Sequence, residues 1–321
     1  MTLSSIYQPI QGEILRLEEN LRKIASYAPP EIAGILSHVL NNGGKRVRPA
    51  LTLLAGKIYH YNVDLLLPMA TAVELLHTAT LVHDDTIDSS PWRRGKPTPH
   101  ALWGNSTAIL LGDYLFATSA HITSSTGNIR AMRLFAQTLV TISSGEILDT
   151  LSSLDLKQTR HHYFQRISDK TASLFSMAAE SGAVLSGAPE EVIQALKDCA
   201  YNLGMGFQIV DDILDFTGEE GRMGKPTGKD LLKGVLTLPA ILFLEHHPDN
   251  EVIKRVCTNK ANEEEIKKAM EMIRQSSSLE ECYEIARGFC SRASLALEGL
   301  PPNPAQQSFF DLARYIIQRE K

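Results

Sequence analysis

The sequence predicts an all-α protein built as a single large helical bundle. Long segments rich in Ala, Leu, Ile, Met and Glu dominate the chain, while alternating strand patterns are scarce. Turn residues separate these segments, and no low-complexity linker of the kind that joins domains interrupts them. We therefore expect one domain over residues 1–321, with two separate helical domains as the weaker alternative.

The expected helices follow one another with short interruptions. The first is amphipathic, because Ile10, Ile14, Leu17 and Leu21 recur at helical spacing. Clusters of glycine, proline and serine mark the boundaries between helices. The predicted helices are 10–27, 68–88, 105–121, 129–154, 163–186, 189–216, 237–246, 262–275, 278–299 and 306–319.

Composition and charge narrow the class of protein. Of 321 residues, 43% are apolar and 21% are charged, as in an ordinary globular protein. The formal net charge of -5 argues against nucleic-acid binding, whereas small anions can still bind at a local basic site. The four cysteines lack CxxC spacing, so we expect reduced thiols and no zinc site.

Neither the N-terminus nor the most hydrophobic stretch has the pattern of a targeting or membrane-spanning segment. The N-terminal residues lack a basic start followed by an apolar run, so no secretory signal is expected. The stretch from Leu65 to His83 is broken by Pro68, Glu74 and His77, which favours a buried helix. We therefore expect a cytoplasmic protein.

Two copies of the pattern Asp-Asp-x-x-Asp carry the strongest chemical signal. They consist of Asp84, Asp85 and Asp88, and of Asp211, Asp212 and Asp215. On a helix these carboxylates repel one another, by about 3 kcal/mol for a pair about 6 Å apart at an effective dielectric constant of about 20. Hard oxygen ligands suit Mg²⁺, so we predict that both clusters bind Mg²⁺ and, facing each other, hold a diphosphate. One copy could be a solvated helix end, but two complete copies after apolar runs are rarely accidental.

Basic residues on either side of the first cluster indicate phosphate binding. The turn Gly43-Gly44 precedes Lys45, Arg46 and Arg48, and Lys45 and Arg48 are spaced so that both could face one anion. We expect Arg46 to be an ordinary solvated surface charge.

Three further groups come close to the first cluster in sequence. Arg93 and Arg94 follow it closely enough to return to the same cleft, and we predict phosphate contacts for both. His77 lies two helical turns before Asp84 on the same face, although a hydrogen-bonded core histidine is an equal alternative.

The ordered motifs resemble the polyprenyl synthetase (isoprenyl diphosphate synthase) family. From Gly43 to Pro239 they read GGKRVRP, ELLHTATLVHDDTID, RRGKPTPH, GDYL, DKTASLF, GFQIVDDILDF, GKPTGKDL and TLP. The resemblance suggests a medium- or long-chain member. It implies an all-α fold around a central cavity, usually homodimeric, and a trans-prenyltransferase that joins isopentenyl diphosphate to an allylic diphosphate with Mg²⁺.

The resemblance also implies roles for single residues. The allylic diphosphate would be contacted by Arg93, Lys170 and Lys225, and isopentenyl diphosphate by Lys45, Arg48, His77 and Arg94. Thr171 and Gln208 would help to stabilise the carbocation, and together with Lys170 they form the expected catalytic set. Lys229 is a weaker candidate for a further phosphate contact. Many members have a lysine where this chain has Val235, so a phosphate contact is missing there.

The expected reaction needs charge stabilisation rather than a nucleophile. Metal and cations would stabilise the leaving diphosphate, and a dry apolar pocket would protect the carbocation from water. The double bond of isopentenyl diphosphate would then attack, and a proton would pass to the diphosphate.

Product length is expected to depend on residues below the first cluster. Ala79 lies about 7.5 Å down the helix from Asp84, and neither it nor Thr80 is bulky. In short-chain members resembling this one, aromatic residues close the tunnel here, so we predict a product of twenty carbons or more. Tyr114, Leu115 and Phe116 are candidates for a deeper floor. Release of such a product would involve transient membrane contact.

Rival functions fit less well. A class I terpene cyclase needs no second diphosphate site, so Lys45, Arg48 and Arg94 argue against it. A non-catalytic subunit of a heteromeric synthase could lose its aspartates, yet both clusters are complete. A Mg²⁺-dependent phosphohydrolase would not explain the long apolar helices.

Overall fold

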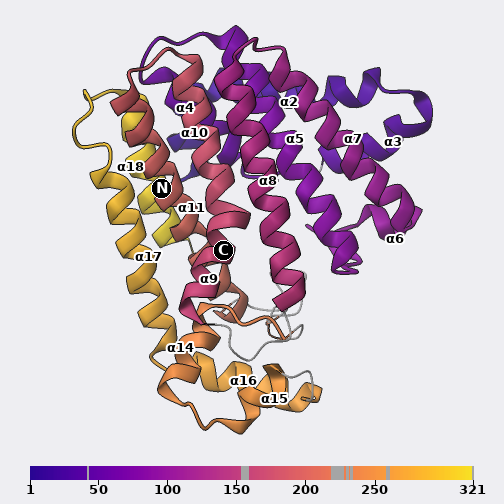
Figure 1. Ribbon diagram of the computed structural model, residues 1–321, viewed down its shortest axis with the longest axis vertical. Coiled ribbons are helices and arrows are strands. Elements are labelled where there is room, and N and C mark those ends of the chain that lie inside the picture. Colours follow the sequence, from indigo (N-terminus) through magenta and orange to yellow (C-terminus); the bar gives the residue numbers. More distant parts are fainter. Residues whose placement is uncertain are drawn as a thin grey trace. The chain divides into compact units, whose positions relative to one another are not determined.

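Helices make up nearly all of the regular structure, as the sequence predicts. The computed structural model describes residues 1–41, 43–152, 159–217, 228, 231, 234–257 and 261–319. In chain order the elements are α1 (Leu3–Ile6), η1 (Gln8–Ile10), α2 (Gln11–Tyr27), α3 (Pro30–Leu40), α4 (Val47–Lys57), α5 (Val63–Ile87), β1 (Trp92–Arg93), β2 (Lys96–Pro97), α6 (Pro99–Trp103), α7 (Asn105–Ser124), α8 (Ile129–Ser152), α9 (Arg160–Ile167), the π-turn η2 (Ser168–Ala172), α10 (Ser173–Leu185), α11 (Glu190–Thr217), α14 (Leu238–His246), α15 (Glu251–Cys257), α16 (Glu263–Arg274), α17 (Ser278–Leu295) and α18 (Pro304–Gln318) (Figure 1). The all-α prediction is confirmed.

The observed helices agree with the predicted ones at the long apolar segments. The main difference lies at 163–186, where one helix was expected and the chain forms α9, a π-turn and α10. Short elements were missed, namely α1, η1, α3, α4, α6, α15 and the β1–β2 hairpin. Prolines open α3 and α6 and lie in the first turn of α4, where the sequence alone reads as turn.

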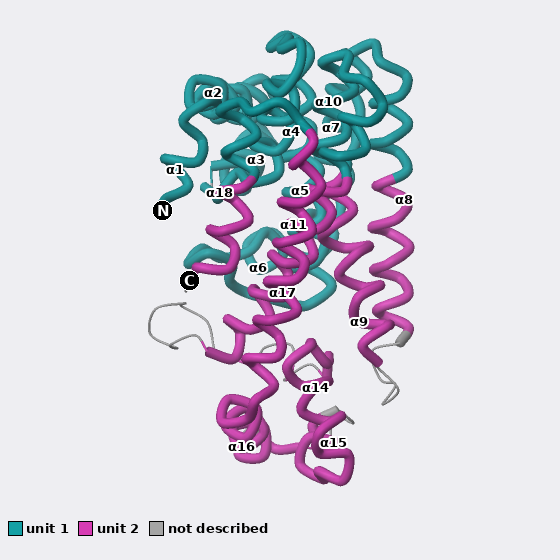
Figure 2. Tube along the Cα trace, turned by 90° about the vertical axis from the view of Figure 1, so that its left-hand side faces the viewer, with its two compact units in different colours: residues 1–137, 177–197, 300–309 teal, residues 138–176, 198–299, 310–321 magenta. Residues whose placement is uncertain are grey.

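The structure divides the chain into two compact units, coloured separately in Figure 2. Unit 1 comprises residues 1–137, 177–197 and 300–309. Unit 2 comprises residues 138–176, 198–299 and 310–321. The expectation of a single domain around a central cavity stays a prediction.

Helix α5 is the core of unit 1. It packs against α2, α4 and α7, and its buried residues include Leu66, Val73 and Ala79. Within the described residues it is the one helix long and apolar enough to cross a membrane, yet 67% of its apolar stretch is buried inside the protein. That burial is what a core helix shows, in line with the sequence expectation.

Unit 2 is built on the second half of α11 and the helices that follow it. Within it α14 packs against α9, α16 and α17, and α15 packs against α16. Cys199 of α11 and Cys282 and Cys290 of α17 are buried free thiols. Burial raises the pKa of each of these thiols, to about 12 for Cys290, so they stay protonated and behave as core residues.

Candidate active site

The first aspartate cluster occupies the last turn of α5 in unit 1. Asp88 caps the helix, and its backbone N–H donates to the Asp84 carbonyl at 2.8 Å, so the two residues lie one turn apart. Asp85 turns into the protein, is only 3% exposed and accepts a hydrogen bond from Arg93 Nε at 2.5 Å. The cluster therefore keeps two carboxylates at the helix end and its middle one in a buried ion pair.

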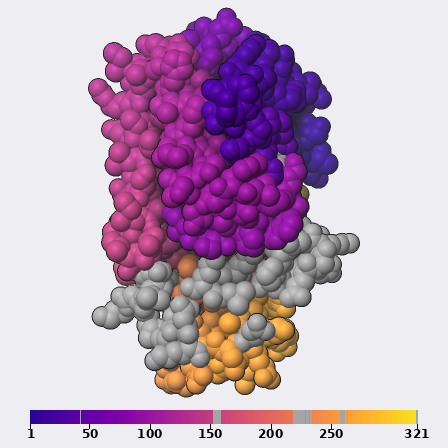
Figure 3. Space-filling model, turned by 90° about the vertical axis from the view of Figure 1, so that its right-hand side faces the viewer, coloured from indigo at the N-terminus to yellow at the C-terminus, as the bar shows by residue number. Residues whose placement is uncertain are grey.

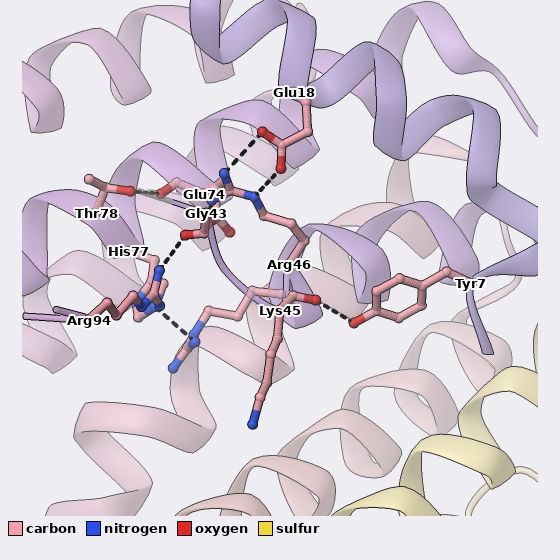
Figure 4. A network of polar contacts seen from close by, with 10 residues as sticks. Tyr7, Glu18, Gly43, Lys45, Arg46, Glu74, His77, Thr78 and Arg94 are labelled. Atoms are coloured by element: carbon pink, nitrogen blue, oxygen red, sulfur yellow. Dashed lines mark hydrogen bonds and ion pairs between the residues drawn. The ribbon is translucent and has the colours of Figure 1, made fainter. Parts of the chain in front are cut away.

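The β1–β2 hairpin brings Arg93 and Arg94 back to this cluster. Arg94 and Gly95 form its two-residue turn, with φ of 50° and 75°, and positive φ at both positions is what a tight hairpin turn requires. The Arg94 guanidinium donates to the Gly43 carbonyl, which ties the hairpin to the glycine turn (Figure 4). Burial lowers the pKa of Arg94, but this group stays a cation at any physiological pH.

Arg46 lies in a buried ion-pair network rather than on the surface. It is 7% exposed, and its guanidinium pairs with Glu18 of α2 at 2.7 Å and with Glu74 of α5 at 2.5 Å (Figure 4). Its backbone is left-handed, with φ 49°, at the N-cap of α4. The prediction of a solvated surface charge is wrong, because carboxylates from two other helices enclose the group. The network fixes the glycine turn against α2 and α5.

Arg48 and His77 contact each other beside this network. Arg48 Nη1 lies 3.2 Å from His77 Nε2. Burial, followed by the charge of Arg48, holds the pKa of His77 well below its usual range, so a neutral imidazole accepts this hydrogen bond. Burial also lowers the pKa of Arg48 to about 10. Lys45 contributes its backbone carbonyl to Tyr7 Oη at 2.8 Å, while its exposed side chain points away from the Arg46 cluster in Figure 4.

One pocket of unit 1 gathers four of the predicted residues. His77, Asp85, Arg93 and Arg94 all line it. The remaining lining includes Arg46, Glu74, Thr78, Val39, Leu81 and Val82. Lys45, Arg48, Asp84 and Asp88 are not among the described residues that line this pocket, although Arg48 reaches it through His77.

In unit 2, the single turn of π-helix η2 (the π-turn) carries Lys170 and Thr171 on a locally widened helix. Such π-helical turns are rare inside α-helices and recur at functional sites. Gly204 of α11 makes this packing possible, since a Cβ there would lie 2.7 Å from the Ala172 Cα. Lys170 Nζ pairs with Glu146 Oε1 of α8 at 2.6 Å.

Thr171 and Gln208 lie in direct contact, while their role toward a carbocation stays a prediction. Thr171 Oγ1 donates to Gln208 Oε1 at 2.8 Å, and Gln208 Nε2 donates to Asp212 Oδ1 at 2.9 Å. The other oxygen of Asp212 accepts a hydrogen bond from Tyr163 Oη at 2.7 Å. Asp212 and Tyr163 are 5% and 1% exposed, so the chain of contacts runs into the interior of unit 2.

The outer residues of the second cluster have other partners. Asp211 forms an ion pair with Arg319, whose guanidinium also lies 4.5 Å from the centre of the Phe207 ring. Burial lowers the pKa of Arg319 to about 10. Asp215 lies one turn after Asp211, and its backbone carbonyl accepts from Gly228 N at 3.1 Å.

Sequence reasoning missed the partner residues of these networks, among them Glu18, Glu74, Glu146, Tyr163 and Arg319. Arg319 stands just after α18, far in sequence from every motif, and no local pattern marks it. Glu74 had a usable signal, because a charged residue inside an apolar helix needs a partner.

Three other predicted positions have different outcomes. Lys225 and Lys229 lie outside the described residues, so their roles stay predictions. Val235 is described, and the next residue, Leu236, accepts a hydrogen bond from Arg166 Nη2 at 2.8 Å through its carbonyl. A cation therefore lies one residue away from the missing lysine.

The candidates for product-length control lie on α5 and α7. Ala79 and Leu115 are fully buried, whereas Tyr114 is 37% exposed. Phe116 meets the His83 ring edge-on, with 5.2 Å between the ring centres. Gly112 lets these helices approach, since a Cβ there would lie 2.1 Å from His83 Nε2. Their influence on product length stays a prediction.

Comparison with known proteins identifies the family. The polyprenyl synthetase family model matches residues 29–273. Heptaprenyl diphosphate synthase component 2 of Geobacillus stearothermophilus is 37% identical over the full length of both chains. A polyprenyl synthase of Caulobacter crescentus, solved with calcium and isoprenyl diphosphate, has a TM-score of 0.94 and 31% identity over 100% of this chain and 98% of that one. A decaprenyl diphosphate synthase of Rhodobacter capsulatus has a TM-score of 0.92 and 36% identity over 100% of both chains.

These matches, together with a pocket that gathers the predicted phosphate-binding groups, confirm the resemblance stated from the motifs. The chain belongs to the polyprenyl synthetase family and is a trans-prenyltransferase.

Proposed function

We propose that this protein uses Mg²⁺ to extend an allylic diphosphate with isopentenyl units to a product of twenty carbons or longer. The pocket of unit 1 carries the proposal, because three guanidinium groups and two carboxylates give its lining a net positive charge beside the first aspartate cluster. The names of the relatives, from heptaprenyl to decaprenyl diphosphate synthase, support a long product.

The aspartates fit Mg²⁺ as a ligand set. No group of three or more His, Cys, Asp or Glu forms a ready-made cage in the part of the chain that the structure describes. Mg²⁺ does not require one, since it usually binds one or two carboxylates and takes water or phosphate oxygens as its other ligands. Asp84 and Asp88 offer such a pair, and Asp211 and Asp215 offer another. Bound there, Mg²⁺ would supply positive charge to the leaving diphosphate.

The residues that line the pocket would bind and orient the diphosphate substrates and exclude water. Asp85 holds the Arg93 guanidinium in place, so its charge stays at the pocket. Arg94 and His77 provide further donors on the pocket wall, and Leu81 and Val82 provide apolar surface that suits a five-carbon unit. The dry apolar surface shields a reactive cation from water.

The direct test is an elongation assay on the purified chain. It is incubated with labelled isopentenyl diphosphate and, separately, ten-, fifteen- and twenty-carbon allylic diphosphates, with Mg²⁺ or with EDTA. We expect a discrete long prenol after dephosphorylation, formed only with Mg²⁺. Elongation that is unaffected by EDTA would contradict the metal proposal, and hydrolysis or cyclisation without elongation would contradict the transferase.

Product length can be tested at Ala79. We expect Ala79→Phe to shorten the product, because a phenyl ring replaces a methyl group on the buried face of α5. Overpacking there costs about 1 to 3 kcal/mol, so the partly exposed neighbour Thr80→Phe serves as a second variant. Ala117→Phe, at an exposed position of α7, is the matched control. An unchanged product distribution in both test variants would remove this part of α5 from the tunnel wall.

We also propose a cytoplasmic homodimer that touches membranes only to release product. Ile109, Leu110 and Tyr114 form an exposed apolar stripe on α7, with 48%, 67% and 37% of each residue exposed. Figure 3 shows the outer surface of α6 and α7, in purple, on the face turned to the viewer. Light scattering should give twice the chain mass, and Leu110→Glu should give monomers.

The name of the Geobacillus relative, component 2, raises a second possibility for assembly. If the wild-type chain is folded but inactive alone, addition of the other component of such a synthase is the decisive experiment. Activity that appears only in the mixture would replace the homodimer by a heteromer.

A further inference from the structure

A buried tyrosine stands at the inner end of the polar chain in unit 2. Tyr163 of α9 donates to Asp212, Gln208 donates to the other oxygen of Asp212, and Thr171 donates to Gln208, over 2.7, 2.9 and 2.8 Å. The three bonds join α9, α11 and the π-turn. A buried carboxylate is tolerated only when its oxygens are hydrogen-bonded, and these two donors meet that need.

The direction of these bonds follows from the chemistry of the groups. An ionised carboxylate only accepts, so both Tyr163 and Gln208 must donate to Asp212. Once the amide nitrogen of Gln208 faces Asp212, its oxygen must face the other way, toward Thr171. The Thr171 hydroxyl then directs its proton at Gln208 and leaves its lone pairs for another partner. Asp212 therefore sets the polarity of a chain that ends with lone pairs on the Thr171 oxygen.

Such polarity suits a developing carbocation, because fixed lone pairs stabilise positive charge without reorganising during the reaction. The guanidinium of Arg166, also on α9, lies 5.6 Å from the centre of the Tyr163 ring.

We propose that Tyr163 is a positioning residue for prenyl transfer, which anchors Asp212 and through it orients the Gln208 amide and the Thr171 hydroxyl toward the reacting cation. The inference rests on the proposed function and deepens it, since it gives the middle aspartate of the second cluster an orienting role.

The test is Tyr163→Phe, which keeps the ring and removes the hydroxyl. We expect kcat to fall about tenfold or more, because one buried hydrogen bond to a charged group is lost, while KM for both diphosphates changes by less than about twofold. We also expect a larger share of the allylic substrate to leave as the free alcohol, since a poorly stabilised cation is more often captured by water.

Tyr201→Phe is the matched control, because Tyr201 Oη donates to Ser168 Oγ at 3.0 Å in the same unit. It should keep wild-type kcat and alcohol share. Thermal unfolding midpoints of both variants, measured without metal, show whether a simple loss of stability explains any difference.

A double-mutant cycle separates positioning from a local effect. If Tyr163 acts through the chain, adding Tyr163→Phe to Thr171→Val should lower kcat far less than Tyr163→Phe does alone. If Tyr163→Phe does not fold, Asp212→Asn replaces it, since an asparagine amide cannot accept from both neighbours.

The outcomes are distinct. A wild-type chain that does not elongate contradicts the proposed function. A wild-type chain that elongates, with an unchanged kcat and alcohol share in Tyr163→Phe or with additive effects in the cycle, contradicts the role of Tyr163.

Discussion

The two aspartate clusters share one sequence pattern but hold their middle residue in different ways. Asp85, 3% exposed, is held by the Arg93 guanidinium, a full positive charge. Asp212, 5% exposed, is held by Tyr163 and Gln208, which are neutral. Because each helical residue turns by about 100°, the middle aspartate of the pattern points away from the face shared by the outer two. In both clusters that direction leads into the protein.

The difference matches the chemistry expected at each place. A pocket for a diphosphate gains from arginines, so a charged partner for Asp85 also serves the ligand. In unit 2 the hydrogen bonds from the Tyr163 hydroxyl and the Gln208 amide stabilise the buried Asp212 carboxylate and fix the orientation of that amide. Ion pairs thus stabilise the buried carboxylates that line the pocket of unit 1, and hydrogen bonds from uncharged groups stabilise Asp212 in unit 2.

The largest expected effect comes from removing Arg46 from the ion-pair network of unit 1. Arg46→Met keeps much of the side-chain volume but removes the cation that is hydrogen-bonded to the buried Glu74 carboxylate, so we expect the free energy of unfolding to fall by about 3 to 5 kcal/mol. Urea denaturation measures this. Arg287→Met, which removes two exposed ion pairs, is the control and should change stability by less than about 1 kcal/mol. Equal stability of the two variants would show that the Arg46 network is not a structural support.

The second prediction tests whether the outer aspartate Asp84 is a metal ligand. We expect Asp84→Asn to lower kcat/KM on the order of a hundred- to a thousandfold and to raise the Mg²⁺ concentration needed for half-maximal activity, since a metal supplies several kcal/mol of charge stabilisation. The same titration on Asp64→Asn, at the exposed start of α5, should match the wild type. An unchanged metal requirement in Asp84→Asn would exclude this residue as a ligand.

Kinetic effects should differ between variants that disturb the two middle aspartates, Asp85 and Asp212. Asp85→Asn removes the charge that orients Arg93, so we expect KM for the allylic diphosphate to rise about tenfold while kcat changes little. Tyr163→Phe should instead lower kcat and change the KM for the diphosphates little. Steady-state kinetics on the two variants side by side would show it, and parallel effects on both constants would mean that the two clusters do not divide the work this way.

The smallest expected effect concerns pH. Because the folded-state pKa of His77 is depressed, the folded protein binds fewer protons there than the unfolded chain. Its stability is therefore highest above the unfolded pKa of about 6.5 and falls as the pH drops below it, by at most about 1.4 kcal/mol per pH unit. Unfolding measured at pH 7.5 and 5.5 should show a smaller loss in His77→Gln than in the wild type. The exposed His161→Gln should retain the wild-type loss.

Much of the helical fold could be predicted, because apolar periodicity and turn residues are local signals. The missed elements show where local signals end. α4 begins directly after Arg46, whose left-handed backbone is held by contacts with α2 and α5, and no pattern inside the turn reveals those contacts. The π-turn at Ser168–Ala172 likewise depends on close packing against Gly204.

The site residues were predicted from motif spacing and from the family resemblance, but their partners were not. Glu18 and Glu74 each lie 28 positions from Arg46, and Asp212 lies 49 positions from Tyr163. Such pairs form only when helices pack, so the sequence shows the charges without showing which of them neutralise one another. That is why Arg46 was mistaken for a surface residue.

The π-turn has a consequence for how this chain can change by insertion and deletion. Its five residues, Ser168–Ala172, interrupt what would otherwise be one continuous helix. Removing a single residue there would restore an ordinary α-helix and rotate α9 by about 100° relative to the start of α10. Tyr163 would then turn away from Asp212, although both aspartate clusters would be unchanged. A one-residue deletion in this turn could silence the enzyme without altering a single residue of either aspartate cluster.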